Sequence, residues 1–108
     1  MKIKLFQINL DRDAYGLAFM SHDWSERHGG PSEENYDLVF EGEVNAQDLE
    51  AIYTIFNTDL PEGYRGRSMS VSDIVQAEGL GTFFCDTYGF VEIAPFDGSL
   101  CALLKSNG

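Results

Sequence analysis

Hydrophobic and polar positions alternate in short runs near the start of the chain, and such runs predict β-strands. Residues 2–9 alternate in this way, although Phe6 interrupts the pattern. Residues 36–44 read YDLVFEGEV and predict a second clear strand. Residues 15–20 are apolar, and their periodicity leaves a strand and a short helix both open. Residues 21–35 are polar and contain Gly-Gly-Pro, which is typical of a long loop.

The second half of the chain predicts an antiparallel hairpin. Residues 70–76 read as one strand, residues 78–81 contain two glycines suited to a turn, and residues 82–86 return as the partner strand. A further strand is expected over residues 90–93, and Pro95 ends it because proline cannot donate to a sheet.

Between these regions lies one strong helical pattern, with apolar positions spaced i, i+3, i+4 and i+7. Asn45 is suited to be the N-cap, and Asp48 would then favour the positive end of the helix dipole. We therefore expect a helix from about Ala46 to Phe56. Its apolar stripe consists of Leu49, Ile52, Tyr53 and Phe56.

These elements predict an α+β fold in one domain, residues 1–108. We expect an antiparallel or mixed sheet of about four to six strands, with one main amphipathic helix packed on one face. The predicted core side chains are Ile3, Leu5, Leu38, Phe40, Leu49, Ile52, Phe56, Val71, Val75, Phe83, Cys85 and Ile93.

The composition is strongly acidic, with 18 Asp and Glu against 7 Lys and Arg and a formal net charge of −11. Such a charge repels nucleic acids and anionic lipids, so direct binding to either is not expected. Solvation is the commoner cause of acidity, but an acidic surface can also imitate the phosphate backbone of DNA. The sequence shows neither a signal peptide nor a membrane span, and we expect a cytoplasmic protein with reduced cysteines at Cys85 and Cys101.

The chain is acidic, yet Arg65 and Arg67 lie close together in it. We expect this basic pair to bind an anionic partner, either an internal carboxylate or an external anion. Asp73 and Asp86 are placed across the predicted hairpin. They could act as an acid–base pair, could pair with one of the arginines, or could simply face solvent. We favour a structural pair between one arginine and one aspartate.

Catalysis by the serines of this segment has little support. A serine nucleophile needs a base within hydrogen-bond reach, and no histidine lies near Ser70 or Ser72 in the sequence. We expect these hydroxyls to bond to nearby backbone instead. His22 and His28 lie in the polar loop, and their spacing matches no familiar metal site. No metal and no cofactor is expected.

Aromatic side chains are frequent in the predicted hairpin. Phe83, Phe84, Tyr88 and Phe90 could form a stacking platform for single-stranded nucleic acid, but such platforms need basic surroundings. Core packing explains them better, because alternate residues of a strand must face inward.

Two runs of this segment carry a family resemblance. RGRSMSVSDIV at residues 65–75 and FFCDTYGFVEI at residues 83–93 resemble the YodL-like domain family, as do YDLVFEGEV and LPEGYRG upstream. The resemblance covers roughly residues 2–96. It implies a bacterial protein of conjugative transposons or other mobile elements, as found in gut bacteria. The family carries no known enzymatic activity, so it implies no catalytic residues. Arg67 stands where many relatives have histidine.

The function expected first is therefore a non-enzymatic protein-interaction module, accessory to a mobile element, with a protein partner of unknown identity. An acidic DNA mimic that inhibits a host restriction or other defence nuclease is the alternative. An enzyme would need a pocket that joins Asp73, Asp86 and a loop histidine. The predicted binding residues of the module are Arg65, Arg67, Ser70, Ser72, Asp73 and Asp86.

Overall fold

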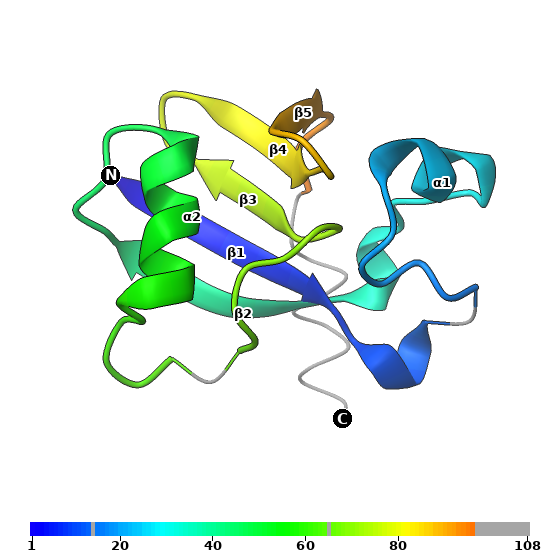
Figure 1. Ribbon diagram of the computed structural model, residues 1–108, viewed down its shortest axis with the longest axis horizontal. Coiled ribbons are helices and arrows are strands. Elements are labelled where there is room, and N and C mark those ends of the chain that lie inside the picture. Colours follow the sequence, from blue (N-terminus) through cyan, green and yellow to red (C-terminus); the bar gives the residue numbers. More distant parts are fainter. Residues whose placement is uncertain (14, 65, 97–108) are drawn as a thin grey trace.

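The fold is a five-stranded antiparallel sheet with the strand order β2-β1-β3-β4-β5 (Figure 1). It comes from a computed structural model that describes residues 1–13, 15–64 and 66–96. The sheet and the single longer helix confirm the predicted α+β class. The strands are β1 (Lys2–Ile8), β2 (Tyr36–Glu43), β3 (Ile74–Ala77), β4 (Gly81–Cys85) and β5 (Phe90–Ile93). The helices are α1 (His22–Arg27) and α2 (Leu49–Thr58), with short 3-10 helices at Leu10–Arg12 and Glu33–Asn35.

Strand β1 lies inside the sheet, between β2 and β3. Both of its faces are covered, because Leu5 and Phe6 are both fully buried, yet they belong to different hydrophobic clusters. The pairing with β2 also shifts between these two residues. The break that Phe6 makes in the hydrophobic alternation is therefore the mark of a strand buried on both sides.

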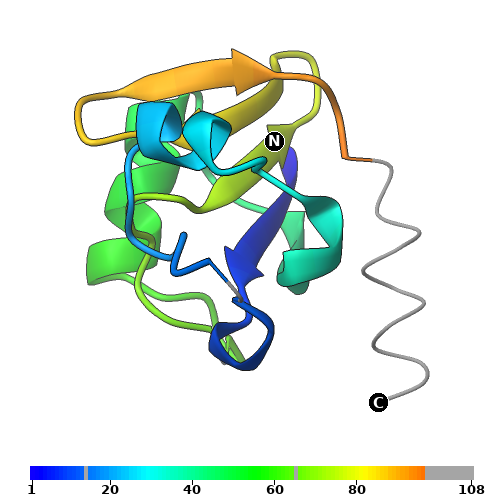
Figure 2. The ribbon, with the colours of Figure 1, turned by 90° about the vertical axis from the view of Figure 1, so that its right-hand side faces the viewer.

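The two clusters lie on opposite faces of the sheet. On one face, Ile52 and Phe56 of α2 are buried together with Leu5 and Val75. Figures 1 and 2 show α2 lying across this side of the strands. The cluster on the opposite face contains Phe6, Ile8, Leu17, Tyr36, Ile74, Phe84 and Phe96.

Helix α2 begins later than the sequence predicts. Its N-cap is Asp48, whose Oδ1 accepts a hydrogen bond of 2.8 Å from the backbone N–H of Ala51. The predicted cap Asn45 is wrong because the chain on either side of it is still entering the core, where Val44 and Ala46 are buried. A cap needs the segment before it to have left the packed interior.

The predicted loop over residues 21–35 is also wrong, because it contains α1 and the 3-10 helix at Glu33–Asn35. Ser21 caps α1 by accepting a hydrogen bond of 3.2 Å from the backbone N–H of Trp24. Two i,i+4 pairs support this helix, His22 with Glu26 and Arg27 with Asp23. The preceding residues 15–20 form turns, so neither the strand nor the helix left open there is present.

Most predicted core residues lie inside. Six of the twelve are buried, namely Ile3, Leu5, Ile52, Phe56, Val75 and Cys85. Five more pack partly buried against the two clusters: Leu38, Phe40, Leu49, Phe83 and Ile93. Val71 belongs to neither cluster, because it precedes the strand instead of lying in it. No helix in the described residues has the length and apolar composition needed to cross a membrane.

Candidate functional site

The end of the sheet where β3 begins carries the polar residues singled out in the sequence. The predicted strand over residues 70–76 is wrong at its start, because β3 begins only at Ile74. Residues 70–73 form a turn closed by a hydrogen bond of 3.1 Å from the backbone N–H of Asp73 to the carbonyl oxygen of Ser70. Ser72 has a positive φ of 83°, which a strand residue does not adopt. The turn places Ser72 and Asp73 inside the protein.

The Asp73 side chain is the centre of this region and is 0% exposed. Its Oδ2 atom accepts two hydrogen bonds of 2.9 Å, one from Gln7 Nε2 and one from the backbone N–H of Ser70. Its Oδ1 atom has no hydrogen-bond partner among the described residues. Ionising a buried carboxyl that has hydrogen bonds to only one of its two oxygens costs free energy, because the charge is not compensated.

Gln7 links this carboxyl to the segment before the turn. Its Nε2 also donates to the carbonyl oxygen of Arg67, and its Oε1 accepts from the backbone N–H of Arg67, both at 2.9 Å. The sheet explains the meeting, because β1 and β3 pair Leu5 with Val75 and Phe6 with Ile74. Continuing this register by one position places Gln7 opposite Asp73. We call Gln7, Arg67, Ser70 and Asp73 the Asp73 cluster.

Burial dominates the acid–base properties of this region. It raises the pKa of Asp73 to about 7, although the hydrogen bonds from Ser70 and Gln7 and the charge of Arg67 act in the opposite direction. Burial, together with the nearby Asp73 carboxylate, also raises the pKa of Tyr64 and of Cys85 to about 12. The same two causes raise the pKa of Tyr36 far above its ordinary value.

Arg67 does not form the ion pair that the sequence suggested. Its Nη2 donates to the carbonyl oxygen of Ile8 at 2.9 Å, and its guanidinium carbon lies 5.3 Å from the centre of the Phe19 ring. Among the described residues it makes no ion pair with Asp73 or Asp86, so the predicted arginine–aspartate pair is wrong for this arginine. Arg65, the other arginine named above, lies outside the described residues.

The remaining predicted residues hold neighbouring segments in place. Asp86 Oδ1 accepts from the backbone N–H groups of His22, at 3.1 Å, and Thr87, at 2.8 Å. Ser72 Oγ accepts from the backbone N–H of Phe19 at 2.9 Å, while Ser70 Oγ donates to a neighbouring carbonyl oxygen. Arg67, Ser70 and Asp86 are partly exposed, so these three can meet a partner directly. Ser72 and Asp73 could do so only after a rearrangement.

The histidines do not join this cluster. The His22 ring packs on Phe84 with 5.1 Å between ring centres, and its Nε2 lies 3.2 Å from Glu26, so only its backbone reaches Asp86. The His28 ring stacks on Trp24 at 4.4 Å. In the described part of the chain, no group of three His, Cys, Asp or Glu side chains could hold a metal ion. The described geometry therefore contains no assembled acid–base site with an imidazole.

The comparison with protein families agrees with this arrangement of motifs. The family model described as YodL-like domain matches residues 2–96. The chain belongs to the YodL-like domain family. No curated protein and no solved structure matches it. The resemblance identified in the sequence is thereby confirmed, and the mobile-element setting stays a prediction.

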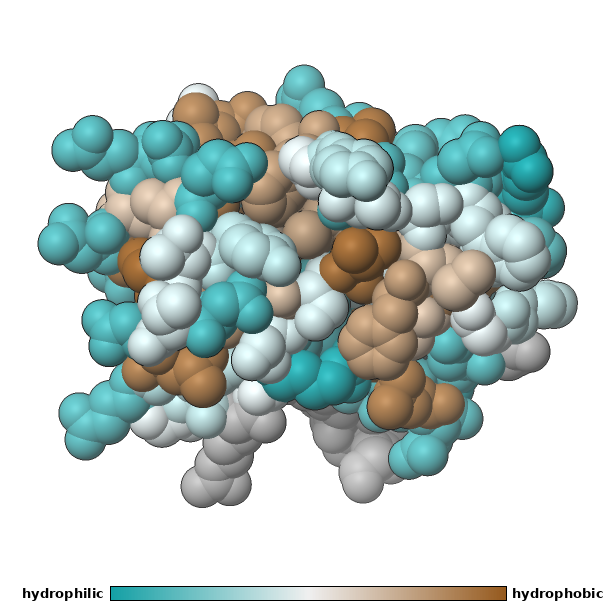
Figure 3. Space-filling view, viewed as in Figure 1, coloured by the Kyte–Doolittle hydropathy of each residue, from teal (hydrophilic) through white to brown (hydrophobic). Residues whose placement is uncertain are grey.

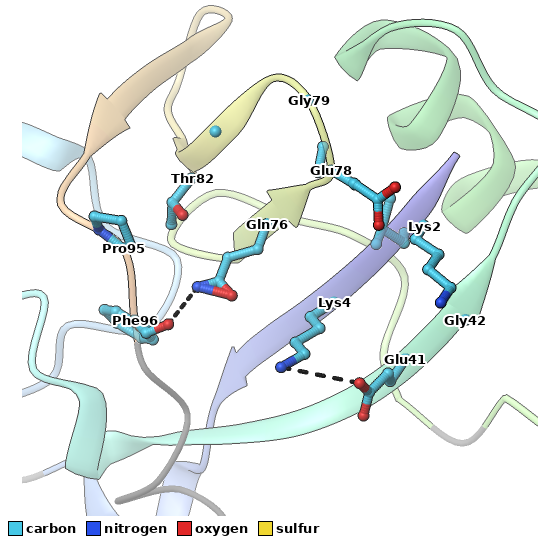
Figure 4. Close-up of a pocket in the computed structure, with 13 residues that line it drawn as sticks. Lys2, Lys4, Glu41, Gly42, Gln76, Glu78, Gly79, Thr82, Pro95 and Phe96 are labelled. Atoms are coloured by element: carbon cyan, nitrogen blue, oxygen red, sulfur yellow. Dashed lines mark hydrogen bonds and ion pairs between the residues drawn. The ribbon is translucent and has the colours of Figure 1, made fainter.

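One pocket of this YodL-like domain lies away from the Asp73 cluster. It has a volume of about 530 Å³ and lies on the sheet face opposite α2 (Figure 4). Lys4 Nζ lies 3.9 Å from Glu41 Oε2 on one side, and the Gln76 side-chain amide donates to the carbonyl oxygen of Phe96 on another. None of the groups with a shifted pKa lines it. The pocket therefore does not include Asp73, the carboxyl group whose pKa burial raises.

A surface feature of the YodL-like domain adjoins the Asp73 cluster. Leu10 is 56% exposed and Phe19 is 49% exposed, and both lie beside Arg67. Leu10 and Arg67 line one shallow hollow of about 370 Å³, and Phe19 lies under the guanidinium. Figure 3 shows hydrophobic side chains gathered over the loops between α2 and α1. We call Leu10, Phe19 and Arg67 the Arg67 surface.

Sequence reasoning did not identify three residues of this region: Gln7, Leu10 and Phe19. A signal for Gln7 was present, since Ile3, Leu5 and Gln7 occupy alternate positions and face the same way in a strand. A polar side chain at the third of these positions needs a buried partner. No comparable signal marks Phe19, whose place depends on contacts with residues about fifty positions away.

Proposed function

We propose that this YodL-like domain is a non-enzymatic protein-interaction module, accessory to a conjugative transposon or other mobile element. The observation that carries the proposal is the Arg67 surface, where the guanidinium lies over the exposed Phe19 ring and the exposed Leu10 lines the same shallow hollow as Arg67. The mobile-element setting rests on the family resemblance.

The composition of the Arg67 surface suits a binding contact. Aromatic residues and arginine are enriched at the centres of protein interfaces, where they contribute most of the binding energy. Phe19 offers its ring and Arg67 offers several N–H donors, with Leu10 extending the apolar area. The backbone below is fixed by Ser72 and Gln7, so a partner would meet a preorganised surface.

The charge of the chain indicates the kind of partner. A net charge of −11 attracts a basic protein surface at long range and speeds its encounter. The partner that fits best has a basic rim around an apolar centre that receives Phe19 and Leu10. Most polar side chains of the SMSVSD motif are engaged in internal hydrogen bonds, which suits a supporting role better than a chemical one.

A capture experiment with matched variants tests this function. The wild-type domain, Phe19→Ser, Arg67→Ala and the control Leu80→Ser are immobilised and exposed to a lysate of the native host, with bound proteins quantified by mass spectrometry. Leu80 is also exposed, but it lies in the turn at the other end of the β3–β4 hairpin. The partner is then purified and titrated against all four proteins.

We expect a basic partner that binds wild type and Leu80→Ser equally, and that binds the other two variants at least about tenfold more weakly. Melting curves show beforehand that each variant is folded. Equal affinity of all four proteins for the partner would contradict the proposed surface. Chemical conversion of a captured molecule by the domain would contradict the non-enzymatic role.

The DNA-mimic alternative receives less support from the distribution of charge. A mimic needs carboxylates in a ridge with phosphate-like spacing, whereas exposed acids here lie on α1, β2, α2, the hairpin turn and β5. Several of them are paired with cations, including Glu41 with Lys4 and Asp23 with Arg27. Capture of a nuclease that binds all four proteins equally would favour the mimic over the module.

A further inference from the structure

Two buried polar atoms of opposite character are left without partners in the same cluster. They are Oδ1 of Asp73, an acceptor, and Nε of Arg67, a donor. Both residues are tied to Gln7, and the Asp73 carboxyl is also bonded to the backbone of Ser70. Buried polar atoms in native proteins are nearly always paired, so two complementary orphans in one cluster need a functional explanation.

The protonation state of Asp73 determines whether its buried position, with one oxygen lacking a hydrogen-bond partner among the described residues, is energetically acceptable. A neutral carboxyl tolerates the present arrangement, with Oδ2 bonded twice and Oδ1 free. An ionised carboxyl in the same place would need a positive partner, because an unpaired buried charge is very unfavourable. The cation that already acts on this carboxyl electrostatically is Arg67, which is at present directed at Ile8 and Phe19.

We propose that the Asp73 carboxyl is a proton-operated latch for Arg67. With the proton bound, Arg67 stays over Phe19 and bonded to the carbonyl oxygen of Ile8, as in the structure. When the proton leaves, the guanidinium turns inward and its Nε–H pairs with Oδ1 of Asp73. The cation is thereby withdrawn from the protein surface, and the Phe19 ring is left without it.

The other ionisable groups around Asp73 do not compete for this role. Asp73 acts electrostatically on Tyr36 from β2, Tyr64 from the segment before the turn and Cys85 from β4, and burial raises the pKa of each. Asp13 and Asp86 act on Tyr36 and Cys85, respectively, in the same direction. All three groups therefore stay neutral where the pKa of Asp73, at about 7, allows its charge to change.

The latch can be tested without any partner, so its outcome is separate from that of the capture experiment. Carboxyl-detected NMR of the wild-type protein follows Asp73 Cγ from about pH 5 to about pH 9, together with Arg67 Nε–Hε and the backbone N–H of Phe19. We expect all three signals to shift with one common midpoint near neutral pH. The contact between Arg67 and the Phe19 ring, seen as an NOE, should disappear above that midpoint.

Two variants sharpen the test. Asp73→Asn keeps an oxygen for Gln7 and Ser70 but cannot ionise, so the Arg67 and Phe19 shifts should be lost. Asp86→Asn removes a partly exposed carboxylate at the same end of the sheet and should leave the shifts unchanged. The proposal is overturned if Asp73 titrates at the ordinary value for aspartate, or if Arg67 does not move with it. The wild-type titration alone decides the matter should Asp73→Asn fail to fold.

Discussion

The two regions that hold this domain together differ in what fills them. Under α2 the interior is apolar, with Ile52 and Phe56 buried against β1 and β3. At the far end of the same strands the interior is polar, with the Asp73 carboxyl held by Gln7 and the turn before β3. The first region depends on shape and burial, whereas the second depends on hydrogen bonds and charge.

This difference indicates how stability and regulation are divided in the molecule. An apolar core responds to lost volume and does not respond to pH. A buried carboxyl responds to pH, because its pKa differs between the folded and unfolded states. Substitutions on the two sides of this division should therefore differ in size and in pH dependence.

The largest expected effect is in the apolar region. Phe56→Ala removes a fully buried ring that packs edge-on against Phe40 and Tyr64, and it should lower the free energy of unfolding by about 3–5 kcal/mol. The loss should be equal at about pH 5 and about pH 8, measured by urea denaturation. Tyr53→Ala, on the exposed side of the same helix, should cost under about 1 kcal/mol. Similar losses of unfolding free energy for Phe56→Ala and Tyr53→Ala would contradict the assignment of a buried and an exposed side to α2.

The second effect is in the polar region and depends on pH. The pKa of Asp73 is raised from 3.8 to about 7 on folding, so between these values the folded state holds a proton that the unfolded state has lost. The proton that the folded state retains on Asp73 favours folding at low pH, and this contribution to stability is lost as the pH rises towards 7. From about pH 5 to about pH 8, wild type should lose on the order of 3 kcal/mol relative to Asp73→Asn.

The same urea titrations measure this difference. Asp86→Asn is the comparison, since its side chain reaches the surface at the same end of the sheet. A constant difference in stability between wild type and Asp73→Asn across this pH range would mean that Asp73 is already ionised in the folded protein at about pH 5, so that folding does not raise its pKa.

The smallest effect tests the boundary of α2. Asp48→Ala removes the side-chain oxygen that caps the backbone N–H of Ala51, and it should destabilise the fold by about 1 kcal/mol. Asn45→Ala should change the stability by less than about 0.5 kcal/mol, because Asn45 is exposed and no cap depends on it. Thermal melts of the two variants, compared with wild type, show which residue caps the helix.

The sequence predicts this fold well wherever local patterns decide the structure. The strands at residues 2–9, 36–44 and 90–93 and the hairpin between β3 and β4 follow from alternation and from glycines at the turn. The helix existed as predicted but began three residues later, since both Asn45 and Asp48 are good caps and only the burial of Ala46 distinguishes them. Short α1 has too few turns for periodicity to reveal it.

The candidate site was less predictable, because its chemistry arises from long-range contacts. Asp73 belongs to a motif that looks polar and solvated, yet it is buried because β1 supplies Gln7 from 66 positions away. Arg67 was expected to pair with an aspartate, but the Ile8 carbonyl group and the Phe19 ring hold it instead. Charge and motif therefore directed attention to the segment that contains Asp73 and Arg67, while the tertiary structure determined which of their polar atoms have partners.

The position of β1 between two strands that follow it in the chain also has a consequence for synthesis. Both of its neighbours, β2 and β3, lie later in the chain, and β3 ends only at Ala77. During synthesis, β1 can therefore pair with β2 once Glu43 has been translated, but its other edge has no sheet partner until residue 77 has been translated. During that interval this strand is the natural target for a chaperone, and a pause in translation before residue 77 should increase aggregation of the nascent protein.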